Sequence, residues 1–335
     1  MRPPIYYVAE ISANHLGSLD RAHKLVELAS EAGASAIKLQ TYKPETMTLP
    51  LEKFSISKNH QLWGGMSLFH LYEEAMTPWS WHKELFEHAK ELGIDAFSSP
   101  FDFSAVDFLE ELSCPIYKIA SMETGDVDLI SYVASKGKPM IISTGASTLS
   151  EIEQAVVAAE RIRNDLTLLV CTSSYPADAT EAHIRRIPAL KERFSVDVGL
   201  SDHTLGIGVS VAAIALGATV IEKHLTLKRK DGGHDAAFSL EPEEFRLLVE
   251  EGNKANASLG DSEWSIQESE SESRRLRRSL HIVKSVKQGE LATRENIKAL
   301  RPNSGGPISD IQRIIGKRFK GDYNPGDAAT IDCVE

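Results

Sequence analysis

The sequence predicts an α/β protein: a (β/α)8 TIM barrel followed by a small C-terminal domain of short strands. Eight short apolar runs rich in Val and Ile alternate with stretches of helical periodicity, which is typical of a parallel barrel. The runs are almost continuously apolar, as expected for parallel strands covered on both faces. They are Tyr6–Ser12, Ala34–Tyr42, Asp95–Asp102, Ile116–Ser121, Pro139–Gly145, Leu166–Tyr175, Val196–His203 and Thr219–Leu227. An open doubly wound sheet is the alternative, but no Gly-x-Gly-x-x-Gly pattern follows the first run.

The segments between these runs are predicted to be helices. In the first, residues 21–32, Leu25, Leu28 and Ala29 recur at helical spacing, and the pattern stops at Gly33. The remaining helix candidates are Trp81–Leu92, Ser104–Leu112, Asp126–Lys136, Ser150–Arg163, His183–Phe194, Val209–Leu216 and Glu243–Leu259.

The connection after the second run, from Lys43 to Pro78, is unusually long and contains Trp63-Gly64-Gly65. Connections of this length are usually functional, so we interpret it as a lid or a substrate-contact loop. An inert insertion is the alternative.

The domain boundaries follow from a change of composition after Leu259. Residues 1–260 form the predicted barrel, and residues 261–278 are polar, first acidic and then basic, which favours a solvated linker or helix face. Residues 279–335 are predicted to form a second domain of short strands and turns, with β-like runs at Leu280–Val283, Lys298–Arg301 and Ala328–Cys333. A domain of this size buries little surface alone, so we expect it to dock on a barrel or on a partner chain.

Composition narrows the function class. The formal net charge of −11 over 335 residues argues against nonspecific nucleic-acid binding, although one pocket can still be basic. Three widely spaced cysteines favour a reducing, cytoplasmic setting over a disulfide framework. The first residues, Met1 to Pro4, lead directly into a strand-like run, so we expect no signal peptide. No apolar stretch reaches the roughly 20 residues that a membrane-spanning helix needs.

Ionisable residues close many of the apolar runs. A barrel gathers the carboxyl ends of its strands at one mouth, where they would form an active site. His203 ends the seventh run and His224 lies near the end of the eighth, so neighbouring strands would bring the two imidazoles together. Two neutral imidazoles, completed by water and substrate oxygens, suit an exchangeable Mn²⁺ or Mg²⁺ better than a closed structural zinc. Two unrelated structural histidines are the alternative.

Lys38 and Lys118 also end apolar runs. A buried lysine needs a carboxylate partner, which Glu10 or Glu123 could supply, or else an anionic substrate. Hydroxyl groups beside lysine ammonium groups are what a phosphate or carboxylate requires. Five serines end or follow strands at the same mouth: Ser99, Ser121, Ser143, Ser173 and Ser201.

Candidate acid–base groups are Glu10 and Glu123, which we expect to be ionised beside a metal ion and two lysines. Asn14, His15 and Asp235 follow the first and eighth runs and could bind the hydroxyls of a sugar-like substrate. Each of these three is also acceptable as an ordinary turn residue.

Several of these segments, taken in order along the chain, resemble the sialic acid synthase family. They are Ala9-Glu10-Ile11-Ser12-Ala13-Asn14-His15, Ile37-Lys38-Leu39-Gln40-Thr41, Ser99-Pro100-Phe101-Asp102, Tyr117-Lys118-Ile119, Ser143-Thr144-Gly145, residues 199–204 and Glu222-Lys223-His224. The segment from Ser279, with Leu300-Arg301-Pro302, resembles the family's C-terminal antifreeze-like (SAF) domain, a β-clip fold. The stretches Leu62-Trp63-Gly64, Leu71-Tyr72-Glu73, Ala75-Met76-Thr77-Pro78 and Trp81-His82 resemble the pseudaminic acid branch. The N-acetylneuraminate branch has an asparagine where this chain has Ser173 and a glycine where this chain has Met122.

The resemblance implies condensation of phosphoenolpyruvate with an open-chain N-acylated amino sugar, with phosphate as the second product. For the pseudaminic acid branch the sugar would be 2,4-diacetamido-2,4,6-trideoxy-L-altrose. Phosphoenolpyruvate would be held by Lys38, Ser99, Lys118, Ser121, Ser143, Ser173 and Ser201. His203 and His224 would bind the metal, and the sugar would contact Glu10, Gln40, Tyr175, Asp235 and Arg301. Arg301 would act in trans, from the partner subunit of a domain-swapped homodimer.

Alternatives of other kinds remain. Within the family, the substrate could be N-acetylmannosamine or the precursor of legionaminic acid. A metal-dependent hydrolase on the same barrel often has a His-x-His pair on the first strand, where this chain has only Asn14-His15. A non-catalytic carbohydrate-binding protein is less favoured, because such a chain would be expected to lose some of these ionisable residues.

Overall fold

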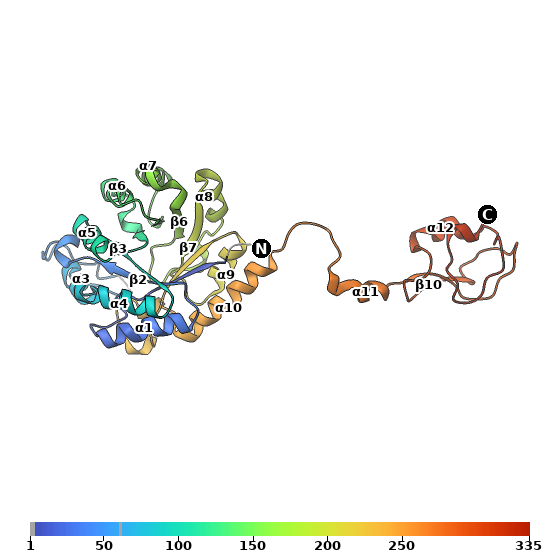
Figure 1. The fold of residues 1–335 in the computed structure, drawn as a ribbon, viewed down its shortest axis with the longest axis horizontal. Coiled ribbons are helices and arrows are strands. Elements are labelled where there is room, and N and C mark those ends of the chain that lie inside the picture. The colour runs from blue at the N-terminus through green and yellow to red at the C-terminus, as the bar shows by residue number, and fades with distance from the viewer. Residues whose placement is uncertain (1–3, 60–61) are drawn as a thin grey trace. The chain divides into compact units, whose positions relative to one another are not determined.

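A computed structural model of the chain describes residues 4–59 and 62–335 (Figure 1). The chain is divided into two compact units, residues 1–260 and residues 261–335. Residues 1–3 and 60–61 lie outside the described part of the chain. The first of these segments is the one from which we expected no signal peptide, and the second belongs to the long connection after the second predicted strand. Within the described residues no helix is both long and apolar enough to cross a membrane.

The first unit is a closed parallel barrel, so the predicted fold class is confirmed. The described residues form eight strands, each hydrogen-bonded to its neighbours in chain order, with the last paired to the first. They are β1 (Tyr6–Glu10), β2 (Ala36–Thr41), β3 (Asp95–Pro100), β4 (Tyr117–Ile119), β5 (Met140–Ser143), β6 (Leu166–Cys171), β7 (Asp197–Ser201) and β8 (Val220–His224).

Helices cover the outside of this barrel (Figure 1). They are α1 (Leu19–Glu31), α4 (Trp79–Glu91), α5 (Phe103–Glu111), α6 (Val127–Ser135), α7 (Leu149–Ala158), α8 (Arg186–Phe194), α9 (Gly208–Ala215) and α10 (Pro242–Ser258). In α1 the buried face repeats at helical spacing through Leu25, Val26 and Ala29, and the Ser18 hydroxyl caps its first turn. Asp102, which closes the third apolar run, caps α5 by accepting from the amides of Ser104 and Ala105.

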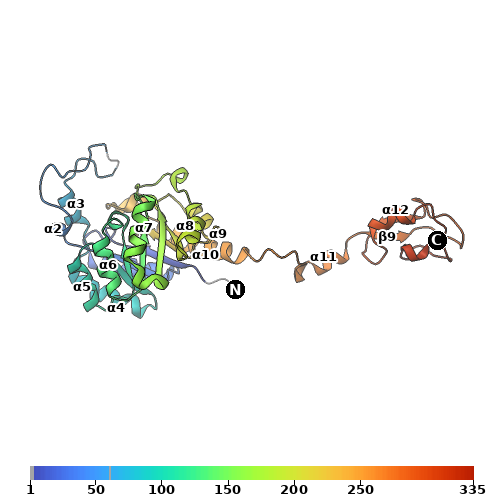
Figure 2. The same ribbon diagram turned by 90° about the horizontal axis from the view of Figure 1, so that it is seen from above.

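The long connection after β2 contains two short helices, α2 (Pro44–Met47) and α3 (Leu68–Ala75). Figure 2 shows this part of the chain at one end of the barrel unit. A local antiparallel pairing joins Ser55 to Ser67, with hydrogen bonds from Ile56 N to Met66 O (2.8 Å) and from Leu68 N to Phe54 O (2.9 Å). The described part of the connection is therefore held by regular backbone hydrogen bonds.

The second unit contains α11 (Ser271–Arg275), the antiparallel pair β9 (Ser279–Ile282) and β10 (Ile297–Leu300), and α12 (Ile311–Ile314). A small apolar core that includes Leu280, Ile297 and Phe319 holds it together. The β-like run expected at Ala328–Cys333 is not a strand. Ala328 makes a single bridge to His281, and residues 331–333 turn into a 3₁₀ helix.

The pairing register of neighbouring strands places several functional side chains at the same height along the barrel. Glu10 on β1 is paired with Lys38 on β2 and with His224 on β8, while Ser201 on β7 is paired with Glu222 on β8. Since strand residues alternate between two faces, Glu222 and His224 share a face and Lys223 points the other way.

Candidate active site

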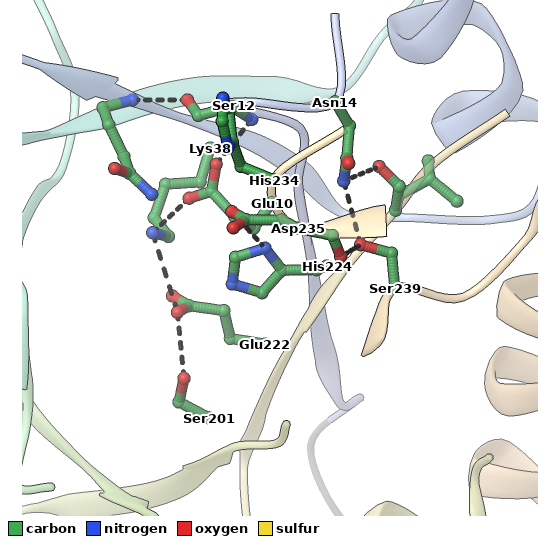
Figure 3. Close-up of polar contacts among 12 residues, drawn as sticks. Glu10, Ser12, Asn14, Lys38, Ser201, Glu222, His224, His234, Asp235 and Ser239 are labelled. Carbon is green, nitrogen blue, oxygen red and sulfur yellow. Dashed lines mark hydrogen bonds and ion pairs between the residues drawn. The ribbon is translucent and has the colours of Figure 1, made fainter. Parts of the chain in front are cut away.

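A buried lysine lies between two carboxylates at the centre of the barrel mouth. Lys38 forms an ion pair with Glu10, and its Nζ lies 3.7 Å from Glu222 Oε1 (Figure 3). The Glu10 carboxylate also accepts a 2.7 Å hydrogen bond from the Ser12 amide, and Ser201 Oγ donates to Glu222 Oε1 at 3.1 Å. The carboxylate partner that a buried lysine requires is thus present on both sides of Lys38.

Lys118 is the second cation of this cluster. It is 1% exposed, and its Nζ donates to the Ile119 carbonyl at 2.8 Å. Burial lowers the pKa of Lys118, and the negative charge of Glu222 opposes that effect only in part. An anionic substrate oxygen beside Lys118 would stabilise its charged form.

Glu222 is a site residue that sequence reasoning missed. Burial alone would favour its neutral form, but the ammonium groups of Lys38 and Lys118 outweigh burial and lower its pKa to about 2. Glu222 is therefore ionised between two lysines. The available signal was its position two residues before His224, which places both side chains on the same face of a strand. Lys223, between them, points outward and forms a 2.9 Å ion pair with Asp202.

The two predicted metal ligands lie together. The ring centroids of His203 and His224 are 5.4 Å apart, and Phe238 packs against both rings. His203 Nδ1 lies 3.0 Å from the Thr172 carbonyl oxygen, which can only accept, so Nδ1 carries a proton and Nε2 is the ring nitrogen that a metal ion could use. Asp235 Oδ2 lies 3.3 Å from His224 Nδ1 and adds an oxygen donor beside the pair.

These residues fit a divalent ion whose shell is completed from outside the protein. No group of three or more His, Cys, Asp or Glu side chains positioned to hold a metal occurs in the described part of the chain. Two imidazole nitrogens with a neighbouring carboxylate suit an exchangeable Mn²⁺ or Mg²⁺ that keeps water or substrate oxygens.

A cavity of about 380 Å³ opens at this mouth, and most of the predicted residues line it. Of the predicted set, its lining includes Lys38, Gln40, Lys118, Ser121, Glu123, Ser143, Tyr175, Ser201, His203, His224 and Asp235. Glu10, Ser99 and Ser173 do not belong to that lining. Glu10 is fully buried in its ion pair with Lys38, and Ser99 Oγ is buried with no hydrogen-bond partner among the described residues. Arg301 belongs to the second unit, so its contact with a sugar remains a prediction.

Gly145, two residues after the end of β5, is a point of close approach to Ser121 and Ser173. A Cβ added there would collide with Ser173 Oγ and would lie 2.8 Å from Ser121 Oγ and 3.1 Å from Cys171 Sγ. The Ser121 hydroxyl lies 3.2 Å from the Gly145 amide. Only glycine lets these three side chains converge on one spot, which is a suitable environment for phosphate oxygens.

Glu123 departs from its expected charge state. We expected a resting carboxylate, but burial raises the pKa of Glu123 to about 7, more than the positive charge of Lys118 lowers it. The carboxyl lies deep enough that the loss of hydration outweighs one nearby cation. A pKa near neutrality suits a group that takes up and releases a proton during turnover.

Cys171, at the end of β6, is a second cavity residue that the sequence reasoning passed over. Burial alone would raise its pKa, but the hydrogen bond and charge of His203, with help from Ser121 and Lys118, lower it to about 7. Its Sγ lies 3.8 Å from His203 Nδ1. All three cysteines of the chain are buried and unbonded to one another.

Asn14 and His15 act as loop-holding residues in this structure. Asn14 Nδ2 donates to the Leu225 carbonyl and to Ser239 Oγ, both at 2.9 Å, and so ties the loop after β1 to the loop after β8. His15 Nδ1 accepts from the Gly17 amide at 3.1 Å, and burial lowers the pKa of this histidine to about 4. These contacts favour the turn-residue interpretation for both.

The long connection after β2 supplies one side of the cavity. Trp63 from this connection donates through Nε1 to the His234 carbonyl at 3.1 Å and packs against Tyr175, with ring centroids 5.8 Å apart. The interpretation as a substrate-contact segment is therefore consistent with its place in the fold. Its aliphatic contribution to the lining, called the aliphatic wall below, consists of Met47, Ile56, Leu68 and Leu71.

Comparison with known proteins identifies the family of this chain. The NeuB family model matches residues 25–264, and the SAF domain model matches residues 277–335. A pseudaminic acid synthase of Campylobacter jejuni is 41% identical over 97% of this chain and 95% of its own length. An N,N'-diacetyllegionaminic acid synthase of the same species is 36% identical over 92% of this chain and 94% of its own. A crystal structure of an N-acetylneuraminic acid synthetase from Leptospira borgpetersenii superimposes with a TM-score of 0.73 at 32% identity, covering 81% of this chain and 90% of that chain.

The resemblance noted in the sequence is thus confirmed at the level of the family, both for the barrel and for the C-terminal domain. The family match covers most of the barrel and includes β2 to β8, where Lys38, Lys118, His203 and His224 lie. The chain belongs to the NeuB family of phosphoenolpyruvate-dependent nonulosonic acid synthases and carries a C-terminal SAF domain.

Proposed function

We propose that this chain is a pseudaminic acid synthase. It would condense phosphoenolpyruvate with the open-chain form of 2,4-diacetamido-2,4,6-trideoxy-L-altrose and with water, giving pseudaminic acid and phosphate. One observation carries the proposal: two lysines, several serine hydroxyls and two histidines from separate strands line a single cavity. Similarity to curated pseudaminic acid synthases over nearly the whole chain supports the choice of sugar.

Phosphoenolpyruvate would bind at the lysine and serine end of the cavity. Lys38 and Lys118 offset its roughly three negative charges, and Ser121, Ser143 and Ser201 would donate to its phosphate and carboxylate oxygens. Ser143 Oγ is buried and has no hydrogen-bond partner among the described residues, so it is available for this role. Ser99 would complete the set together with Ser173, whose Oγ lies close to the position of Gly145.

The sugar would lie on the other side of the histidine pair. Gln40, Tyr175 and Asp235 line the cavity and would contact the aldehyde end of the sugar, and Glu10, which pairs with Lys38, would help to orient it. His203 and His224 would hold the divalent ion that NeuB-family synthases generally use, here Mn²⁺ or Mg²⁺. When bound, that ion would stabilise the negative charge that develops on the aldehyde oxygen. Arg301 would reach the sugar from the partner subunit of a domain-swapped dimer.

The reaction balances with the groups in the cavity. C3 of phosphoenolpyruvate forms a bond to the aldehyde carbon, and water adds to the resulting cationic C2. Glu123, with its pKa near 7, would take one proton from that water and pass it to the departing phosphate. The second proton of the water leaves as the C2 hydroxyl becomes the carbonyl, and it balances the proton that the aldehyde oxygen takes up when the carbon–carbon bond forms. The C2–O bond to phosphate then breaks, leaving the carbonyl of the product.

The test is turnover with chemically defined amino sugars. We expect phosphate release with phosphoenolpyruvate and the L-altro sugar, and in ¹⁸O-labelled water the label should enter the sugar acid. Label in the released phosphate would refute C–O cleavage. Legionaminate synthesis is the second candidate, because a legionaminic acid synthase is 36% identical to this chain, and turnover of the D-manno isomer alone would establish it.

A further inference from the structure

We infer that the aliphatic wall selects the acceptor sugar by binding its methyl groups, and so restricts the enzyme to 6-deoxy sugars with acylated amino groups. This inference rests on the proposed function and identifies the part of the chain that sets its substrate class. The reacting groups at the strand ends would be shared by all acceptors, whereas the wall would distinguish between them.

The cavity has two chemically different sides. The strand ends contribute the ionisable and hydroxyl groups, among them Lys118, His203 and Glu222. Among the described residues that line the cavity, those from residues 43–78 are the four side chains of the aliphatic wall together with Trp63, Tyr72 and Ala75. None of these seven carries a charge. A bound sugar would therefore meet ionisable groups from the strand ends and uncharged, mostly apolar side chains from the connection.

The wall is preformed in the structure. Ile56 and Leu68 are both placed by the Ser55–Ser67 pairing, through hydrogen bonds from their own amides of 2.8 and 2.9 Å. Leu71, one turn later on α3, is buried. The indole of Trp63 is anchored to the His234 carbonyl on the opposite loop. A wall already held in place contributes to discrimination, because binding does not have to order it first.

Hydrocarbon favours one class of acceptor over the other. The aldehyde must lie near the histidine pair, so the far end of the sugar points away from the strand ends. In a 2,4-diacetamido-2,4,6-trideoxy sugar that end carries a C6 methyl and a second acetyl methyl, which gain from contact with aliphatic side chains. In N-acetylmannosamine the same positions carry hydroxyls, which would lose their water without gaining a protein partner.

The experiment compares kcat/KM for the L-altro trideoxy sugar, its D-manno isomer and N-acetylmannosamine in four proteins. These are the full-length wild type, Leu68→Asn, Ile56→Thr and the control Leu51→Asn. Ile56 is half-buried, and threonine keeps its branched shape, so this variant tests the wall even if Leu68→Asn folds poorly. Leu51 belongs to the same connection but is 41% exposed and lies outside the cavity lining.

We expect the wild type to prefer a trideoxy sugar over N-acetylmannosamine by about 100-fold, within the range that single apolar groups supply. Leu68→Asn and Ile56→Thr should each reduce that ratio about tenfold, while their KM for phosphoenolpyruvate stays unchanged. The control Leu51→Asn should keep the wild-type ratio. A wild-type ratio in both wall variants would overturn the inference, as would equal use of N-acetylmannosamine by the wild type.

The outcomes also separate the inference from the proposed function. Turnover of only the D-manno isomer, with the ratio reduced in the wall variants, would refute the pseudaminic acid assignment and uphold the wall. Turnover of the L-altro sugar, with the same ratio in the wall variants as in the wild type, would uphold the pseudaminic acid assignment and refute the role of the wall.

Discussion

Replacing Glu222 by glutamine should destabilise the folded barrel without weakening phosphoenolpyruvate binding. Glu222 is 4% exposed and lies close to Lys38, with Lys118 as its second cationic neighbour. Glutamine keeps the shape and can still accept the hydrogen bond from Ser201, so the main change is the loss of one negative charge.

The magnitude follows from the pKa. Burial raises the pKa of Glu222, but Lys38 and Lys118 lower it further, from 4.5 to about 2. At 1.36 kcal/mol for each tenfold step in proton affinity, this favours the folded state by about 3 kcal/mol at neutral pH. Because the folded pKa lies below the unfolded one, the contribution is complete above about pH 4.5 and is lost as the pH falls toward 2.

The assay is denaturant unfolding of the wild type and Glu222→Gln between pH 3 and pH 7. We expect Glu222→Gln to lose about 3 kcal/mol at pH 7 and the difference to shrink in acid. Glu27→Gln, which removes an exposed carboxylate paired with Lys24 at 2.8 Å, is the matched control and should unfold like the wild type. Equal stability of Glu222→Gln and wild type at pH 7, or a KM for phosphoenolpyruvate that rises in Glu222→Gln, would refute the electrostatic reasoning.

Four further predictions concern catalysis. Chelation should abolish turnover and Mn²⁺ should restore it, whereas a metal-stripped His203→Ala variant with full activity would exclude His203 as a ligand. Burial raises the pKa of Glu123 to about 7, so as a base it is lost in acid, and kcat should fall below about pH 7 in the wild type but lose that pH dependence in Glu123→Gln. Gly145→Ala should raise the KM for phosphoenolpyruvate at least about tenfold by displacing two serine hydroxyls, and an unchanged KM would place the phosphate elsewhere. Arg301→Ala and Glu10→Ala subunits, each inactive alone, should recover activity when mixed, and no recovery in mixed dimers would argue against the domain swap.

The barrel and its histidine pair were predictable because both depend on local patterns. Apolar runs of strand length separated by amphipathic segments predict parallel strands, and the closure of β8 on β1 follows from repeating that unit. Once His203 and His224 end consecutive strands, their proximity is a consequence of the fold. The run at Ala328–Cys333 was assigned wrongly because a short apolar segment can pair at one bridge and then turn, and periodicity over so few residues does not distinguish the two.

The chain's own order of residues determined which chemical groups reach the mouth: lysines, serines, histidines and glutamates at the ends of apolar runs. Tertiary structure alone decided which partners those groups have, which of them are charged and what shape of cavity they surround. Glu222 and Lys223 are adjacent and both buried, and strand alternation sends them to opposite faces, but the folded barrel decides that their partners are Lys38 and Asp202. The near-neutral pKa of Glu123 and the hydrocarbon face formed by the connection after β2 likewise depend on depth and on neighbours brought from distant positions. Charge state and cavity shape are properties of the surroundings in three dimensions, and residue type with spacing does not specify those surroundings.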